Sequence, residues 1–270
     1  MPSIDALPDA DWLGFCRRAS EAVRKALAAY PTPAERAVET GRGEGGDMAL
    51  VIDRAAEDAI FAELEQLGVP LTAISEERGQ LELGGGGDTR VVIDPVDGSL
   101  NAKRRLPFAA VSIAVASGPR MADVQLGWVA ELEPVRDWWA VRGQGAFRDG
   151  ERLPALEPGP LELLGLETAR PEALAEAADR IGAVEASRVR AMGSVAVTLC
   201  LVAAGQLDAM VSLLPIRSVD AAAGQLIVQE AGGAAAFPAD DRLTLEMRSQ
   251  VAAARDQDLL RRVLDGFSGN

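Results

Sequence analysis

The segment from Asp94 to Ser99 carries the residue types that metal-assisted phosphate chemistry requires. A β-branched run, residues 89–93, leads into Asp94, and Asp97 follows three residues later. A proline between them forces a turn, so both carboxylates can converge on one point. Gly98 allows close backbone approach, and Ser99 opens a short helix whose N–H groups can hold a phosphate. A capped turn with two solvated aspartates is the alternative.

Other acidic residues stand where helices begin or strands end. Asp53 and Asp220 each occupy the expected N-cap position of a helix, where a carboxylate satisfies free N–H groups. Glu76 and Glu77 follow a short predicted strand, residues 71–74. Taken singly, each aspartate is most simply explained as a helix cap, and the two glutamates are most simply explained as surface charge.

The composition restricts the chemistry. The chain has 270 residues, 27 basic and 41 acidic side chains, a net charge of −14 and no histidine. Histidine-dependent triads, dyads and metal sites are therefore excluded, and the oxygen ligands that remain favour hard cations such as Mg²⁺ over zinc or copper. The negative charge argues against binding to nucleic acid or to an anionic membrane.

Cys16 and Cys200 lie far apart in the sequence without a CxxC motif, which predicts buried thiols in a reducing compartment. The acidic N-terminus does not resemble a signal peptide, and the longest apolar run, residues 195–204, is too short to span a bilayer. We expect a cytoplasmic protein.

The two halves of the chain differ in their pattern. The first half predicts a helix over residues 9–30, a strand over 48–52 and a helix that begins at Asp53. Short β-like runs between Phe108 and Phe147 predict an antiparallel meander.

After Pro154 the pattern alternates between strands and helices, which predicts an α/β unit. The expected strands cover residues 161–166, 187–190 and 207–213, and the expected helices cover 171–181, 194–204 and 219–231. We place a domain boundary near residue 150. An α+β domain, 1–150, would carry most of the candidate ligands, and a smaller α/β domain, 151–270, would supply Asp220 and substrate contacts.

Taken together, these motifs resemble the inositol monophosphatase family, which belongs to the Mg²⁺-dependent, lithium-sensitive phosphatases that include fructose-1,6-bisphosphatases. The resemblance rests on Asp53, Glu76-Glu77, the Asp-Pro-Val-Asp-Gly-Ser run and the Val219–Gly224 run, in this order. It extends from about residue 10 to residue 265. It implies a mixed α+β and α/β fold, a layered α-β-α-β-α sandwich of the sugar phosphatase type.

The resemblance also implies a metal site. Its ligands would be Glu76, Asp94, the carbonyl of Val96, Asp97 and Asp220. Two or three Mg²⁺ ions would bind, Mn²⁺ could substitute, and Li⁺ or Ca²⁺ would inhibit.

The resemblance further implies that Asp53, Glu76 and Ser99 are catalytic. Asp53 and Ser99 would form a proton relay that activates the attacking water. The N–H groups of Gly98 and Ser99 would cradle the phosphate, and Glu77 would support the ligands from behind.

Three positions depart from the family pattern. Val219 replaces a tryptophan, so a packing contact is lost. Leu50 replaces a residue with a hydroxyl group, so a hydrogen bond near Asp53 is lost. Arg42 replaces the lysine of the family's mobile loop, which keeps the charge but changes its geometry.

Four residues are candidates for substrate binding: Arg217, Arg104, Arg105 and Ser194. The arginines could bind a second phosphate, or they could be ordinary surface charges. We expect a homodimeric Mg²⁺-dependent phosphatase that acts on a small phosphate monoester of the inositol 1-phosphate type. The alternatives are a fructose-1,6-bisphosphatase, an enzyme with both activities, and a non-catalytic metal-binding homologue.

Overall fold

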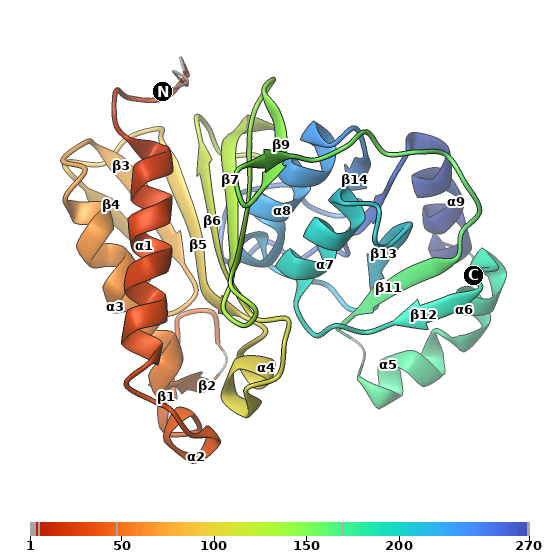
Figure 1. The fold of residues 1–270 in the computed structure, drawn as a ribbon, viewed down its shortest axis with the longest axis horizontal. Coiled ribbons are helices and arrows are strands. Elements are labelled where there is room, and N and C mark those ends of the chain that lie inside the picture. Colours follow the sequence, from red (N-terminus) through yellow and green to blue (C-terminus); the bar gives the residue numbers. More distant parts are fainter. Residues whose placement is uncertain (1–3, 5, 47, 169, 269–270) are drawn as a thin grey trace.

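Two large β-sheets, each with helices on both faces, form the framework of the molecule (Figure 1). The structure, a computed structural model, describes residue 4 and residues 6–46, 48–168 and 170–268. Its layers follow in the order helix, sheet, helix, sheet, helix, as the predicted sandwich requires. None of the helices in these ranges is long and apolar enough to cross a membrane.

The first two layers are a helix pair and an eight-stranded sheet. Helices α1 (Trp12–Leu27) and α3 (Val51–Glu65) pack on each other and on one face of this sheet. The spatial order of its strands is β10 (Glu151–Arg152), β9 (Gly145–Arg148), β8 (Arg136–Val141), β7 (Val124–Glu131), β6 (Ala110–Ala116), β5 (Arg90–Asp97), β3 (Leu71–Ser75) and β4 (Gly79–Leu83). Strands β5 to β10 pair antiparallel in sequence order, which confirms the predicted meander.

The remaining layers come from the second half of the chain. Helices α7 (Val195–Ala203) and α8 (Ser218–Glu230) lie between the two sheets. The five-stranded sheet has the order β12 (Arg188–Arg190), β11 (Leu163–Glu167), β13 (Ala209–Ser212), β15 (Ala252–Ala254) and β14 (Ala234–Ala236). Its outer face is covered by α5 (Pro171–Glu176), α6 (Ala178–Val184) and α9 (Gln257–Ser268).

Short elements complete the fold. Strands β1 (Glu39–Arg42) and β2 (Met48–Leu50) form a small antiparallel ribbon, and a 3₁₀ turn covers Met121–Asp123. Helices α2 (Pro33–Arg36) and α4 (Ser99–Arg104) pack on each other.

The large sheet is buried on both faces because its side chains alternate between two cores. Val91 and Ile93 of β5 point to the core under α1 and α3, whereas Val92 points to the core around α7 and α8. This second core contains side chains from both halves of the chain, so the division into two domains near residue 150 remains a proposal. Cys16 and Cys200 are buried, unpaired thiols.

The predicted N-cap positions, Asp53 and Asp220, were wrong by three residues, because the N-cap residues are Leu50 and Arg217. Helix α3 begins at Val51 and α8 begins at Ser218, so both aspartates lie inside the first turn. Each carboxylate accepts a hydrogen bond from the backbone N–H three residues before it. They still satisfy a free helix N–H group, but from within the helix, as the acidic residue of a capping box does.

We expect Gly127→Ala to lower the free energy of unfolding by about 1–3 kcal/mol, because overpacking strains a close-packed interface. A Cβ atom at Gly127 would lie 2.4 Å from the carbonyl oxygen of Ala223 in α8. The matched control is Gly182→Ala, since a Cβ atom there meets nothing within 4 Å. Urea denaturation of both variants measures the difference, and equal stabilities would contradict the predicted clash.

Candidate active site

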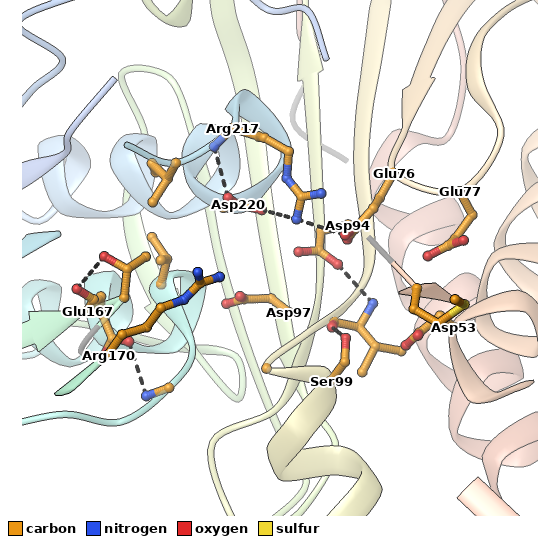
Figure 2. Close-up of a pocket in the computed structure, with 17 residues that line it drawn as sticks. Asp53, Glu76, Glu77, Asp94, Asp97, Ser99, Glu167, Arg170, Arg217 and Asp220 are labelled. Atoms are coloured by element: carbon orange, nitrogen blue, oxygen red, sulfur yellow. Dashed lines mark hydrogen bonds and ion pairs between the residues drawn. The ribbon is translucent and has the colours of Figure 1, made fainter. Parts of the chain in front are cut away.

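Most of the candidate residues line one cavity of about 480 Å³ (Figure 2). Its walls come from α3, from the ends of β3, β5 and β11, and from the first turns of α7 and α8. The predicted residues that line it are Asp53, Glu76, Glu77, Asp94, Val96, Asp97, Gly98, Ser99, Arg217 and Asp220. The structure therefore brings all the predicted metal ligands to one place.

An irregularity in β5 lets both of its aspartates face the cavity. Asp94 pairs with Ser112 of β6, and Asp97 pairs with Ala110, so three steps on one strand match two on the other. On a regular strand, side chains three residues apart point to opposite faces of the sheet. The extra residue between Asp94 and Asp97 turns the side chain of Asp97 to the same face as that of Asp94. The turn continues into Gly98, whose φ of +84° suits glycine. A Cβ atom there would lie 2.7 Å from the carbonyl oxygen of Phe108.

Asp97 is fixed from the other half of the chain. One of its oxygens, Oδ2, accepts hydrogen bonds from the Ser194 hydroxyl at 2.5 Å and from the Ala196 N–H at 2.6 Å. Burial, followed by the nearby charge of Asp220, raises the pKa of Asp97 to about 8, although both hydrogen bonds oppose this rise. Ser194, which was predicted to bind substrate, does not line the cavity. Its hydroxyl contacts the carboxylate of Asp97 instead.

Asp53 and Ser99 face each other across the edge of the cavity (Figure 2). Asp53 Oδ2 accepts from the Leu50 N–H at 2.8 Å, so the backbone supplies a bond at this departure from the family pattern. Asp53 Oδ1 is buried without a hydrogen-bond partner among the described residues. Burial raises the pKa of Asp53 to about 6, and the Leu50 N–H and the Ser99 hydroxyl lower it. The Ser99 hydroxyl donates to the Val96 carbonyl at 2.9 Å.

Arg217 stands between two predicted metal ligands. Its Nη2 lies 2.7 Å from Glu76 Oε1 and 3.4 Å from Asp220 Oδ1. Burial raises the pKa of Glu76 to about 7, against the lowering effect of Arg217. The guanidinium therefore neutralises part of an acidic cluster from which water is largely excluded.

The donor set fits magnesium. The side-chain and backbone atoms that could bind a metal are all oxygens, and a hard cation takes six or more oxygen ligands. Burial and repulsion from Glu76 raise the pKa of Asp94 well above its usual range, as expected where a compensating cation belongs. Glu77 Oε2 is a further buried oxygen without a hydrogen bond in the described chain. Among the described residues, no three acidic side chains are close enough together to hold an ion as they stand.

Four predicted residues lie outside this cavity: Ser194, whose contact with Asp97 is given above, and three arginines. Arg105 donates to the Pro31 carbonyl at 2.8 Å and pairs with Glu133, on a different part of the surface. Arg104 is exposed and does not line the cavity. Arg42 lies in β1, and its Nη1 donates to the carbonyl of Gly46 at 2.8 Å.

Sequence reasoning missed three polar residues of the cavity: Glu167, Thr168 and Arg170. Glu167 is buried at the end of β11, where it accepts from the Thr198 hydroxyl at 2.6 Å and from the Gly193 N–H at 3.0 Å. Burial raises its pKa to about 7. Figure 2 shows Arg170 beside Glu167, with its side chain directed toward Asp97. The available signal was their position after a predicted parallel strand, since ligand sites in α/β sheets form at the carboxyl ends of strands.

Val219 is buried at the position where the family has tryptophan. It is 1% exposed in the core between the sheets, and its carbonyl accepts from the Ser112 hydroxyl at 3.4 Å. The departure therefore changes the packing behind Asp220 without exposing it.

Comparisons with known proteins identify the class to which this fold and its acidic cavity belong. The model of the inositol monophosphatase family matches residues 13–266. A fructose-1,6-bisphosphatase/inositol-1-monophosphatase of Methanothermobacter thermautotrophicus is 33% identical over 94% of this chain and 95% of its own. The Nus factor SuhB of Escherichia coli is 38% identical over 76% of each chain.

A solved inositol monophosphatase-fructose 1,6-bisphosphatase superposes with a TM-score of 0.80 at 24% identity, covering 95% of this chain and 99% of its own. The chain belongs to the inositol monophosphatase family. It is a phosphatase, and this family is generally metal-dependent.

We expect Arg217→Gln to lower the stability of the metal-free protein by about 2 kcal/mol at neutral pH, because two mostly buried carboxylates lose their guanidinium. Millimolar Mg²⁺ should restore most of this loss, since a cation replaces the missing charge. Arg217→Lys, which keeps the charge, is the control. Melting temperatures with EDTA and with Mg²⁺ measure the effect, and a loss unchanged by Mg²⁺ would contradict it.

Proposed function

We propose that this protein is a Mg²⁺-dependent phosphatase that hydrolyses a small phosphate monoester of the inositol 1-phosphate type. The observation that carries the proposal is the convergence of Glu76, Asp94, Asp97 and Asp220, with the Val96 carbonyl, on one cavity beside the turn at Gly98. These five groups would hold the metal. When bound, Mg²⁺ neutralises phosphate charge and makes a water molecule more acidic.

The protein's own groups would position the reactants. Asp53 Oδ1 carries no hydrogen bond in the described part of the chain, so it is available to accept a proton from the attacking water. A pKa of about 6 keeps it ionised at neutral pH. The Ser99 hydroxyl, held by the Val96 carbonyl, lies where it can relay that proton. The backbone N–H groups of Gly98 and Ser99 would orient the phosphate.

The second candidate is an enzyme that also accepts fructose 1,6-bisphosphate. Support comes from the printed name of the Methanothermobacter relative and from Arg170. Arg217 is already engaged by Glu76 and Asp220, whereas no carboxylate of the described residues lies within 4 Å of the Arg170 guanidinium. Arg170 lies across the cavity from Ser99, so it could pair with a second phosphate of the same substrate (Figure 2).

Further features of the proposal follow the family resemblance. We propose two or three Mg²⁺ ions, replaceable by Mn²⁺ and opposed by Li⁺ or Ca²⁺, and a homodimer in solution. A non-catalytic protein that kept this fold is the remaining alternative, and the E. coli relative is named for a role other than phosphatase activity.

We expect phosphate release from inositol 1-phosphate to require Mg²⁺ and to fall by about a thousandfold or more in Asp97→Asn, because a metal-assisted displacement loses a ligand. Fructose 1,6-bisphosphate, 2′-AMP and glycerol 2-phosphate complete the panel. The measurement is inorganic phosphate released with and without EDTA. Absence of turnover on every compound at millimolar Mg²⁺ would favour the non-catalytic alternative.

We expect Arg170→Gln to reduce kcat/KM for fructose 1,6-bisphosphate by about 10- to 100-fold, which corresponds to one lost charge-assisted hydrogen bond. The loss for inositol 1-phosphate should stay within about threefold, since it lacks a second phosphate. Arg104→Gln is the matched control, because this arginine is exposed and lies outside the cavity. Equal losses on both substrates would remove Arg170 from substrate selection.

A further inference from the structure

A second hollow, of about 280 Å³, lies apart from the active-site cavity and shares no residue with it. It is formed by the end of α1, by α2, by the residue that ends α4 and by the loop between β7 and β8. Figure 1 places α2 and α4 at the same end of α1. Its lining residues are Arg24, Leu27, Ala28, Pro31, Arg36, Arg105, Leu132, Glu133 and Val135.

The hollow is basic, in contrast to the chain as a whole. Three arginines and one glutamate line it, and Asp137 pairs with one of these arginines, whereas the chain as a whole carries a net charge of −14. Arg105 and Glu133 are about half exposed, with a closest approach of 3.4 Å. An exposed ion pair of this kind contributes little to stability, and Glu133 offsets part of the positive charge.

Arg36 is a buried cation without an acidic partner. The residue is 8% exposed, and its guanidinium donates to the carbonyls of Tyr30 at 2.9 Å and of Ala102 at 2.8 Å. No carboxylate in the described ranges lies within 4 Å of it. Buried arginines are normally paired with an acidic group. Burial lowers the pKa of Arg36, the charge of Glu133 raises it, and the charge of Arg105 lowers it further. A negative charge from outside the chain would complete this environment.

Arg24 contributes a second unsatisfied donor. Its Nη2 pairs with Asp137 at 2.5 Å and donates to the Glu131 carbonyl, but its buried Nε has no hydrogen-bond partner in the described chain. A buried donor left without a partner costs free energy comparable to a lost hydrogen bond. Two mostly buried guanidinium groups therefore line one space, together with the half-exposed Arg105.

We propose that this hollow binds a small divalent oxyanion of the phosphate or sulfate class. Planar guanidinium groups with several N–H donors are the groups proteins favour for such anions. Leu27, Leu132 and Val135 give the hollow an apolar wall, and its volume exceeds that of one such group, so an oxyanion attached to a small organic body also fits. This site does not depend on the proposed phosphatase function.

Arg105 lines this hollow and not the active-site cavity because of its place in α4. It is the C-cap residue of α4, whose first residue is Ser99, so it lies at the opposite end of this helix from the phosphate turn. Arg36 donates to the carbonyl of Ala102 in the same helix. An anion bound here would therefore contact groups that support α4 from its distal end.

The test is equilibrium dialysis of radiolabelled sulfate against the full chain in EDTA, with chloride added to keep the ionic strength constant. Wild-type protein, Val135→Glu and Val135→Gln are compared. Val135 lines the hollow and is 64% exposed, so neither substitution disturbs the core. Glutamate adds a negative charge at the wall, whereas glutamine has the same size without the charge.

We expect saturable sulfate binding by the wild type, weakened about tenfold or more in Val135→Glu and changed less than about twofold in Val135→Gln. If sulfate bound only in the active-site cavity, neither substitution at Val135 would change its affinity. Equal affinities in all three proteins, or absence of saturable binding by the wild type, would overturn the proposal.

Discussion

Mutual repulsion among buried carboxylates is the constraint on which the rest of this structure depends. Asp94, Asp97, Asp220 and Glu76 converge on one cavity largely shielded from water, and such an arrangement is unfavourable unless each group is held. Each aspartate is fixed by a backbone N–H: that of Val96 for Asp94, of Ala196 for Asp97 and of Arg217 for Asp220. These bonds occupy one oxygen of each aspartate, and the other oxygen of Asp220 lies 3.4 Å from Arg217 Nη2.

The fold supplies those N–H groups from three different places. The first comes from the irregular turn in β5, and the other two come from the N-termini of α7 and α8. A helix N-terminus stabilises negative charge through its free N–H groups and its dipole. The five-layer arrangement brings two such termini against the end of one strand, and the small residues of α8 permit this approach. Ala221, Ala222 and Ala223 are all buried there.

The sequence was sufficient for the features that are local. The strand-turn-helix around Asp94 and Asp97, the antiparallel meander and the helices of the second half follow from spacing and residue type. The order of the acidic motifs indicated the family. The start of α3 was misplaced because Leu50 has no capping side chain, and the stabilising carboxylate of Asp53 lies three residues further on.

Features created by tertiary contacts could not be predicted in the same way. Glu167 and Arg170 reach the cavity only because β11 ends beside α7, which no local pattern reveals. Arg104 and Arg105 follow the turn at Gly98 closely in sequence. Helix α4, which has six residues, separates them from this turn in space. Proximity along the chain was therefore a poor guide to proximity in space for these arginines.

The hydrogen bonds from Ser194 and Ala196 to Asp97 have a consequence for how the enzyme is assembled. A carboxylate borne by the large sheet is oriented by a helix that is synthesised about a hundred residues later. A nascent chain that ends before α7 would carry the aspartates of β5 but would lack the Ser194 and Ala196 groups that orient Asp97. Competence to bind a cation would thus be a property of the finished molecule, and the same contact ties the large sheet to α7 at the point where chemistry is expected.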